Sequence, residues 1–383
     1  MNRTFAEIPL IRRLLLCNTP FAVWRMPGET DVQALIGSLS EVVFPADLQA
    51  VVAEQGFVFA PFVDTPESPI VVLRPGIWLK NSREIAAFDA SALPCFPEPP
   101  AKSETWHTAV EKGRYISAVE RAIAEIAGGA FSKVILSRVA VHPFAESVCD
   151  AELRAYYNEL MFIKLLQLLP NSLVYIVNLP KAGLWLGGTP EALFLQHDAR
   201  CETVSLAGTQ LRQPSGDYLW HTKEIEEQAF VSRYMLDVFY RFGVWPYHTA
   251  GPETAETGNV AHLKTTFSFA ADKIAEKAGD FIAALHPTPA VCGLPKAEAR
   301  DFILRSEPSP RRYYTGFLGP CCPDGSIRLY VNLRCMEIVD QHCLLHLGGG
   351  ITARSVPEKE WNETVAKAQP LYDAIAFAHK MKL

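Results

Sequence analysis

The sequence predicts a fold of the α+β class, in which two antiparallel sheets pack together and helices lie outside them. Strand-like runs come in pairs and triplets joined by turn residues, as in residues 172–212 and 311–350. Segments with helical periodicity stand singly between these groups. A doubly wound fold would instead alternate single strands with single helices. With 383 residues, of which 49% are hydrophobic, the chain is long enough for one large domain or two ordinary ones.

The individual elements follow from the hydrophobic period and from turn residues. Apolar residues recur at helical spacing from Tyr115, and Gly128 and Gly129 then form a typical helix stop. Residues 93–102 are rich in Pro and Glu and are expected to form a connecting loop. The expected helices are residues 115–127, 150–168, 218–242, 280–285 and 295–307, and the expected strands are residues 56–63, 68–79, 131–144, 172–180, 183–196, 201–212, 262–272, 311–319, 326–339 and 342–350.

Charge and hydropathy exclude two classes of partner. The net charge is −6 and no basic block occurs, which argues against nucleic acid as the main partner. No apolar run is long enough to span a membrane, and Arg12 and Arg13 interrupt the apolar stretch near the amino terminus. We therefore expect a cytoplasmic protein without a membrane partner.

The cysteines and histidines do not form a metal-binding pattern. The nine cysteines are scattered without a Cys-x-x-Cys pair, so we expect them to be reduced and mostly to serve as packing residues. His342 and His346 are four residues apart in an expected strand, where their side chains would be too far apart to share one ion. Cys343 stands where a zinc protease would need Glu, so a zinc enzyme is not expected.

The most informative stretch is residues 344–367. An apolar strand is expected to break at three glycines beginning with Gly348, where exposed amides could bind an anion. A helix then begins near Pro357. Glu360, Glu363 and Lys367 follow at spacings of three and four and so share one helix face. The alternative reading is a loop followed by a solvated helix face.

Two isolated charges in apolar surroundings are candidates for acid–base chemistry. Glu191 follows a Pro at a strand boundary among apolar side chains, where a raised pKa would suit a general acid. Lys133 begins a strand that is otherwise Val, Ile and Leu, where a lysine can act as a base. The alternatives are a solvent-exposed Glu at a strand end and an edge-strand Lys that reaches the surface.

A second Glu-x-x-Glu pair suggests a cation site. Glu224 and Glu227 lie on one face of an expected helix, as Glu360 and Glu363 do on theirs. Two such faces could meet across a hard cation, and ligands that are all oxygen favour magnesium over zinc or copper. The alternative is two independent solvated faces.

Three further segments contain candidate ligand-binding groups. Arg334 lies in an expected apolar strand, where a guanidinium usually has an anionic partner such as a structural carboxylate or a ligand carboxylate. A strand is expected to break at Gly208 and Thr209, whose amide and hydroxyl could bind a carboxylate. His262 stands alone, for which a structural role is the default interpretation.

In order and spacing, these segments resemble the chorismate-utilising enzymes. The resemblance covers residues 115–383, whereas residues 1–110 match only as the variable first part of the same domain. It implies a single domain over residues 1–383, with the two packed antiparallel sheets of anthranilate synthase component I. The matching segments are FSKVILSR, GGTPEALF, VSLAGT, KEIEEQAFV, HLKT, LHPTPAVCGLPKAEA, YYTGFLG, NLRCMEI and HLGGGITARSVPEKEWNET.

Within this family the resemblance is to isochorismate synthases, isomerases that convert chorismate into isochorismate. It implies that Lys133 activates a water for attack on carbon 2, and that Glu191 protonates the hydroxyl leaving carbon 4. It also implies a Mg²⁺ cofactor held by Glu227 and Glu363. Glu224 and Glu360 would orient metal-bound water. The residues implied in substrate binding are Gly208, Thr209, His262, Ala290, Tyr314, Arg334, Gly348 and Lys367.

A few positions distinguish the branches of the family. Lys133 and Ala207 argue against the branches that make anthranilate and aminodeoxychorismate, and Ala290 and Ile351 suit isochorismate formation. Tyr314 is more typical of salicylate synthases, which eliminate pyruvate from isochorismate, so a salicylate synthase is the alternative. Menaquinone biosynthesis is preferred over a siderophore pathway, and no obligatory protein partner is expected.

Overall fold

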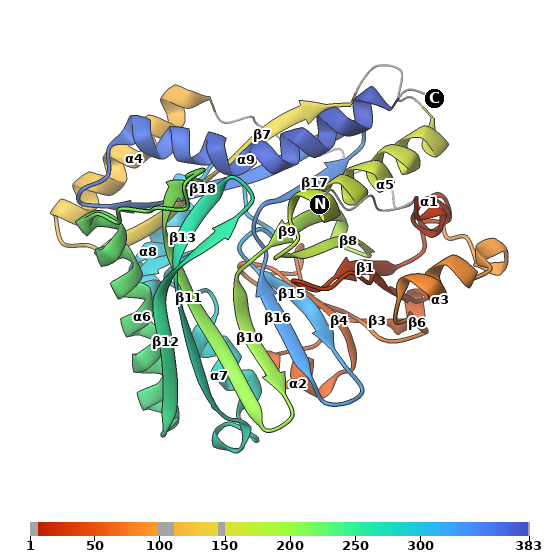
Figure 1. The fold of residues 1–383 in the computed structure, drawn as a ribbon, viewed down its shortest axis with the longest axis horizontal. Helices are drawn as coiled ribbons and strands as arrows, with labels where there is room; N and C mark the ends of the chain where they lie inside the picture. Colours follow the sequence, from red (N-terminus) through yellow and green to blue (C-terminus); the bar gives the residue numbers. More distant parts are fainter. Residues whose placement is uncertain (1–6, 98–110, 145–149, 382–383) are drawn as a thin grey trace.

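The computed structural model describes residues 7–97, 111–144 and 150–381. These residues form two nine-stranded sheets, in which neighbouring strands pair antiparallel. Helices cover the outer faces of both sheets (Figure 1). The predicted α+β class, with two packed antiparallel sheets and helices outside, is therefore confirmed.

Each sheet combines strands from both halves of the chain. The first sheet has the order β14 (Gly293–Leu294), β7 (Lys133–Pro143), β18 (His342–Thr352), β17 (Cys335–Val339), β9 (Gly183–Thr189), β8 (Leu173–Leu179), β1 (Phe21–Arg25), β2 (Gln33–Ile36) and β6 (Ile77–Leu79). The second has the order β12 (Tyr247–Thr257), β13 (Val260–Ala270), β11 (Arg200–Leu211), β10 (Ala192–His197), β16 (Ile327–Val331), β15 (Phe317–Cys321), β4 (Gly56–Ala60), β5 (Val71–Leu73) and β3 (Val42–Val43).

The helices bury their apolar faces on the outer sides of the sheets. One cluster of buried side chains joins the first sheet to α1, α5 and α9, and another joins the second sheet to α2, α6 and α7. None of the described helices is long and apolar enough to cross a membrane. The α-helices are α1 (Pro9–Leu16), α2 (Leu48–Ala53), α3 (Ser82–Ala87), α4 (Lys112–Ala127), α5 (Ala151–Leu168), α6 (Thr222–Phe242), α7 (Ala278–Leu285), α8 (Lys296–Ser306) and α9 (Pro357–Lys380).

Five predicted strands differ from the observed ones. Residues 68–79 form β5 and β6, and residues 183–196 form β9 and β10, and the two strands of each pair belong to different sheets. Residues 326–339 are not one strand, because β16 ends at Val331 and β17 begins at Cys335 in the other sheet. The strand expected to break at Gly348 instead continues as β18 to Thr352, because it pairs with β7 along its whole length. The break expected at Gly208 is a shift in register within β11, and Gly208 has a φ of +68° there.

Several predicted boundaries are also displaced. The helix expected from residue 218 begins at Thr222, and the strand expected over 311–319 begins at Phe317 because the preceding residues form turns. The helix expected at 115–127 is confirmed as α4, which ends before Gly128. The loop expected at 93–102 is only partly visible, since residues 98–110 lie outside the described part.

The expectation that all cysteines are reduced is wrong for one pair. Cys17 and Cys95 form a disulfide across 78 residues, because the loop after α3 returns to the end of α1 and Phe96 N donates to Cys17 O. Cys149 lies outside the described residues. The free cysteines in the described part are mostly buried packing residues, namely Cys201, Cys292, Cys321, Cys322, Cys335 and Cys343.

The two sheets meet across a core of aromatic side chains. Phe59 on β4 is fully buried and stacks on Tyr313, with ring centroids 4.4 Å apart. The rings of Trp185 and Tyr175 are inclined to the Phe59 ring by 67° and 58°, with centroids 6.0 Å and 6.2 Å away. Contacts of this kind stabilise aromatic clusters beyond the area they bury. This core holds the sheets together next to the site described below.

Phe59→Ala should therefore lower the free energy of unfolding by about 3–5 kcal/mol, because it leaves a cavity between the sheets. Urea denaturation followed by circular dichroism would measure the change. Tyr240→Ala is the control: this side chain is 89% exposed, so a change within about 0.5 kcal/mol is expected. Equal losses in the two variants would show that the inter-sheet cluster does not stabilise the fold.

Candidate active site

The site lies where the chain crosses from one sheet to the other. The link between β9 and β10 carries Glu191, and the link between β16 and β17 carries Arg334. The two links are hydrogen-bonded to each other, since Val331 N donates to Glu191 O at 2.9 Å and Gly188 N donates to Arg334 O at 3.2 Å. Two residues that are far apart in sequence are thereby brought to one place between the sheets.

A pocket of about 710 Å³, including its mouth, opens at this crossing. Four of the predicted site residues do not line the pocket: Lys133, Glu224, Glu360 and Glu363. The structure brings the other ten together in its lining: Glu191, Gly208, Thr209, Glu227, His262, Ala290, Tyr314, Arg334, Gly348 and Lys367.

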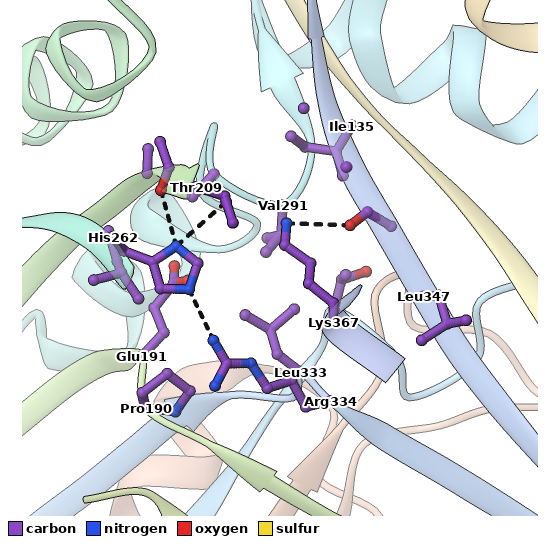
Figure 2. Close-up of a pocket in the computed structure, with 18 of the residues that line it drawn as sticks. Ile135, Pro190, Glu191, Thr209, His262, Val291, Leu333, Arg334, Leu347 and Lys367 are labelled. Atoms are coloured by element: carbon purple, nitrogen blue, oxygen red, sulfur yellow. Dashed lines mark hydrogen bonds between the residues drawn. The ribbon is translucent and has the colours of Figure 1, made fainter. Parts of the chain in front are cut away.

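Arg334 supplies a buried positive charge to the pocket. Its guanidinium donates to Thr257 O at 3.2 Å and lies 2.8 Å from His262 Nε2 (Figure 2). Burial lowers its pKa to about 10, and the charge of Glu191 partly offsets that effect. Among the described residues, no carboxylate lies within ion-pair distance of Arg334. The anionic partner that the sequence predicts is therefore not a structural carboxylate of this part of the chain.

His262 is held as a neutral ring that orients Arg334. Burial, together with the charges of Arg334 and Lys367, lowers its pKa well below the ordinary value. A neutral ring has one N–H, and Nδ1 lies 2.9 Å from Gly208 O and 3.4 Å from Thr209 Oγ1. Nδ1 is therefore assigned as the donor to Gly208 O, and Nε2 accepts from Arg334 (Figure 2).

Glu191 is a buried carboxyl group with an unsatisfied oxygen. It is 3% exposed, and its Oε1 has no hydrogen-bond partner among the described residues. Burial raises its pKa to about 8, although Lys133, Lys367 and Arg334 act in the opposite direction. The group is therefore largely protonated at neutral pH and can donate a proton to a bound molecule.

Lys133 lies beneath the pocket and is fully buried at the start of β7. Its ammonium is 3.0 Å from Glu227 Oε1, and Glu227 belongs to α6 and lines the pocket. Burial would raise the pKa of Glu227, but the charge and hydrogen bond of Lys133, together with the charges of Lys223 and Lys367, outweigh burial and the pKa is lowered. The charge of Lys133 also acts on Glu191, so base and acid candidates belong to one electrostatic site.

The glycines of β18 form the surface on which these groups meet. A Cβ atom added at Gly350 would collide with Glu227 Oε1 and lie 3.3 Å from Lys133 Cε. At Gly348 it would lie 2.7 Å from the Tyr314 hydroxyl. The glycines are required because side chains from other elements approach the strand closely, and not because the strand ends there.

Glu227 of one Glu-x-x-Glu pair and both carboxylates of the other pair lie near the glycines of β18. A Cβ at Gly349 would lie 3.6 Å from Glu363 Oε1 and 3.8 Å from Glu360 Oε2. Burial and the charge of Glu363 raise the pKa of Glu360. Glu224 does not approach these glycines with its carboxylate, which instead accepts a hydrogen bond from His221 N at 3.0 Å and caps α6.

Lysines neutralise these carboxylates in the structure. Lys367 Nζ is 2.7 Å from Glu363 Oε1 and donates to Gly348 O at 3.3 Å (Figure 2). Lys223 Nζ is 2.7 Å from Glu360 Oε1. Burial lowers the pKa of Lys223, but the carboxylates outweigh burial and the pKa is raised. Within the described ranges, no set of three or more His, Cys, Asp or Glu side chains is arranged as a ready metal site.

Sequence reasoning missed two residues of the site. Lys223 lies four residues before Glu227 on α6, and that spacing was a usable signal for a shared helix face. His346 was considered only for zinc, yet it lines the pocket and stacks between Trp185 and Tyr314, with centroids 5.0 Å and 5.4 Å away. Its place follows from the pairing of β18 with β17, which sequence does not show.

The chain is similar in sequence to several known enzymes. Over 265 residues the chain is 30% identical to isochorismate synthase EntC of Escherichia coli, covering 67% of this chain and 66% of the relative. It is 29% identical to isochorismate synthase DhbC of Bacillus subtilis, with coverage of 69% and 68%. A salicylate synthase of Mycolicibacterium paratuberculosis is 31% identical, with coverage of 68% and 58%. The chain thus spans about two thirds of these relatives.

Solved structures support the fold. A putative 2,3-dihydroxybenzoate-specific isochorismate synthase from Bacillus anthracis superposes with a TM-score of 0.75 at 22% identity, covering 96% of this chain and 99% of that one. The menaquinone-specific isochorismate synthase MenF of Escherichia coli gives 0.73 at 22% identity, with coverage of 98% and 92%. The family model described as chorismate binding enzyme matches residues 39–376. This chain belongs to the chorismate-binding enzyme family.

Proposed function

We propose that this enzyme isomerises chorismate to isochorismate, by adding water at carbon 2 of the ring and releasing the hydroxyl from carbon 4. The observation that carries the proposal is that a fully buried lysine, Lys133, acts electrostatically on a buried carboxyl group, Glu191, that is largely protonated at neutral pH. Lys133 would accept a proton from the attacking water, and Glu191 would donate one to the leaving hydroxyl. The relatives named isochorismate synthase support this assignment.

The positive groups of the pocket suit a dicarboxylate. Arg334 has no carboxylate partner of its own in the described part of the chain, and Lys367 lies beside the Gly348 carbonyl at the pocket surface. A guanidinium can bind a carboxylate through two parallel hydrogen bonds. Because the protein has a net charge of −6, these local cations would have to attract the substrate dianion against the overall charge.

The carboxylates over β18 fit a magnesium ion. Glu227 Oε1 occupies the space that a Cβ at Gly350 would fill, Glu363 Oε1 lies near Gly349, and burial together with the charge of Glu363 raises the pKa of Glu360. Oxygen-only ligands suit Mg²⁺. Bound by Glu227 and Glu363, Mg²⁺ would draw electrons toward a ring carboxylate. Only the neutral amine of Lys133 could accept a proton from water, so a proton would have to leave the Lys133 ammonium before that step.

Salicylate synthase is the second candidate, because Tyr314 lines the pocket and its hydroxyl lies over Gly348. Ala290 also lines the pocket and favours isochorismate as the product. The preference for a menaquinone pathway stays a prediction, since isochorismate synthases of more than one pathway resemble this chain.

The direct test is to incubate the purified protein with chorismate, with and without Mg²⁺, and to identify the products by chromatography. We expect isochorismate without pyruvate, formed only with Mg²⁺. Lys133→Met should reduce turnover by about 10²–10⁴-fold, because the base is lost. Lys164→Met on α5, where the ammonium lies 5.2 Å from the Phe377 ring, should retain turnover. Salicylate with equimolar pyruvate would support the second candidate, and no turnover would contradict both.

The raised pKa of Glu191 predicts how kcat/KM depends on pH. Because its pKa is raised to about 8, the acid is protonated below that pH and is lost as pH rises through it, so kcat/KM should fall on the alkaline side. Glu191→Gln should lower kcat/KM by about 10²–10⁴-fold and remove this alkaline limb. Glu159→Gln replaces another fully buried glutamate, away from the pocket, and should keep the wild-type profile. An unchanged alkaline limb in Glu191→Gln would exclude Glu191 as the acid.

The metal ligands can be tested without turnover. Isothermal titration calorimetry with MgCl₂ should show binding to the wild type and at least tenfold weaker binding to Glu363→Gln, because a neutral amide replaces an anionic ligand. Glu358→Gln is the control, since its carboxylate lies on the same helix but pairs with Lys112 at the surface. Equal affinities for Mg²⁺ in Glu363→Gln and the wild type would refute the ligand assignment.

A further inference from the structure

One side of the pocket is assembled from three separate segments. Ile135 comes from β7, Ala290 and Val291 come from the turn before β14, and Tyr314 and Thr315 come from the turn before β15. None of these segments is adjacent to another in sequence, so their relative positions depend on contacts between them. We call these five residues the pocket wall.

Arg311 contacts all three segments from behind. Its guanidinium donates to Val291 O at 2.7 Å, to Ile135 O at 2.8 Å and to Thr315 Oγ1 at 3.2 Å. The side chain is buried and does not itself line the pocket. Because Val291 and Ile135 are held through their carbonyls, the contacts fix the backbone of the pocket wall.

Glu307, at the end of α8, completes this arrangement. It accepts from Arg311 Nε at 2.8 Å and from Nη2 at 2.6 Å, so all five guanidinium donor positions have partners. The same carboxylate accepts from Ser137 N at 2.7 Å and Ser137 Oγ at 2.8 Å, which ties it to β7. The face of the guanidinium lies 4.5 Å from the Phe62 ring.

We propose that Arg311 is a positioning residue, which sets the pocket wall against Lys133 on β7 and thereby against the reacting carbon atoms. The part of this inference that concerns turnover rests on the proposed function, whereas the part that concerns the wall does not. Lys cannot replace Arg here, because an ammonium has three donors and no planar fork to span three segments and a carboxylate. A displacement of about 1 Å at a reacting centre costs roughly 10²-fold in rate.

The test compares Arg311→Lys with Arg25→Lys. Arg25 is a matched control, because it is equally buried and donates to the carbonyls of Leu166, Leu169 and Ser172, none of which lines the pocket. We expect kcat/KM for chorismate to fall roughly 10²-fold in Arg311→Lys. In Arg25→Lys it should stay within about twofold of the wild type, at temperatures where both variants are folded.

Hydrogen exchange tests the wall without substrate. Ile135 N donates to Cys292 O and Cys292 N donates to Thr288 O, so both amides report on the wall. Both should exchange at least tenfold faster in Arg311→Lys than in the wild type, and neither should change in Arg25→Lys. If Arg311→Lys does not fold, Glu307→Gln keeps the guanidinium, removes the charge of its partner and should show the same changes to a smaller extent.

The outcomes separate the two proposals. Wild-type exchange at Ile135 and Cys292 in a folded Arg311→Lys or Glu307→Gln variant would overturn the positioning role, as would equal losses of kcat/KM in Arg311→Lys and Arg25→Lys. If the wild type does not turn over chorismate, the proposed function fails, and faster exchange in Arg311→Lys would still establish that Arg311 holds the wall.

Discussion

The site depends on the pair of backbone hydrogen bonds that joins the two crossings between the sheets. Val331 donates to Glu191, and Gly188 donates to Arg334. The backbone groups of each crossing are buried, so they need hydrogen-bond partners within the protein. Each crossing finds these partners in the other crossing. The consequence is that one carboxyl group and one guanidinium are buried at the same point, in surroundings that their own strands could not provide.

Burial of so many charges is sustained by balance within the site. Glu227, Glu360 and Glu363 each have a lysine partner, namely Lys133, Lys223 and Lys367. Glu191 and Arg334 have no ion-pair partner in the described part of the chain. Burial raises the pKa of the Glu191 carboxyl group and lowers the pKa of the Arg334 guanidinium. Unpaired buried groups are costly for folding. Such costly groups are typical of ligand-binding sites and not of positions that stabilise the fold.

Many of the site residues could be predicted from residue types and their spacing in the sequence. The isolated Glu191 and Lys133 in apolar runs, and the matching Glu-x-x-Glu spacings of Glu227 and Glu363, are local patterns, and the structure brings all four into one region. Arg334 was recognised because a guanidinium inside a sheet usually has an anionic partner. The prediction that Arg334 lies within a strand was wrong, because the apolar run over residues 326–339 does not show that the chain passes from one sheet to the other there.

The sequence by itself determined the class of fold, the periodicity of its elements and the chemical types of the site residues, because these are set by local spacing and side-chain chemistry. Only the tertiary structure decided that the glycines from Gly348 lie inside a strand, since pairing with β7 outweighs local flexibility. It also decided the tautomer assigned to His262 and the protonation of Glu191, which depend on burial and on neighbours far away in sequence. The role of Arg311 likewise depends on three segments that meet only when the sheets are packed.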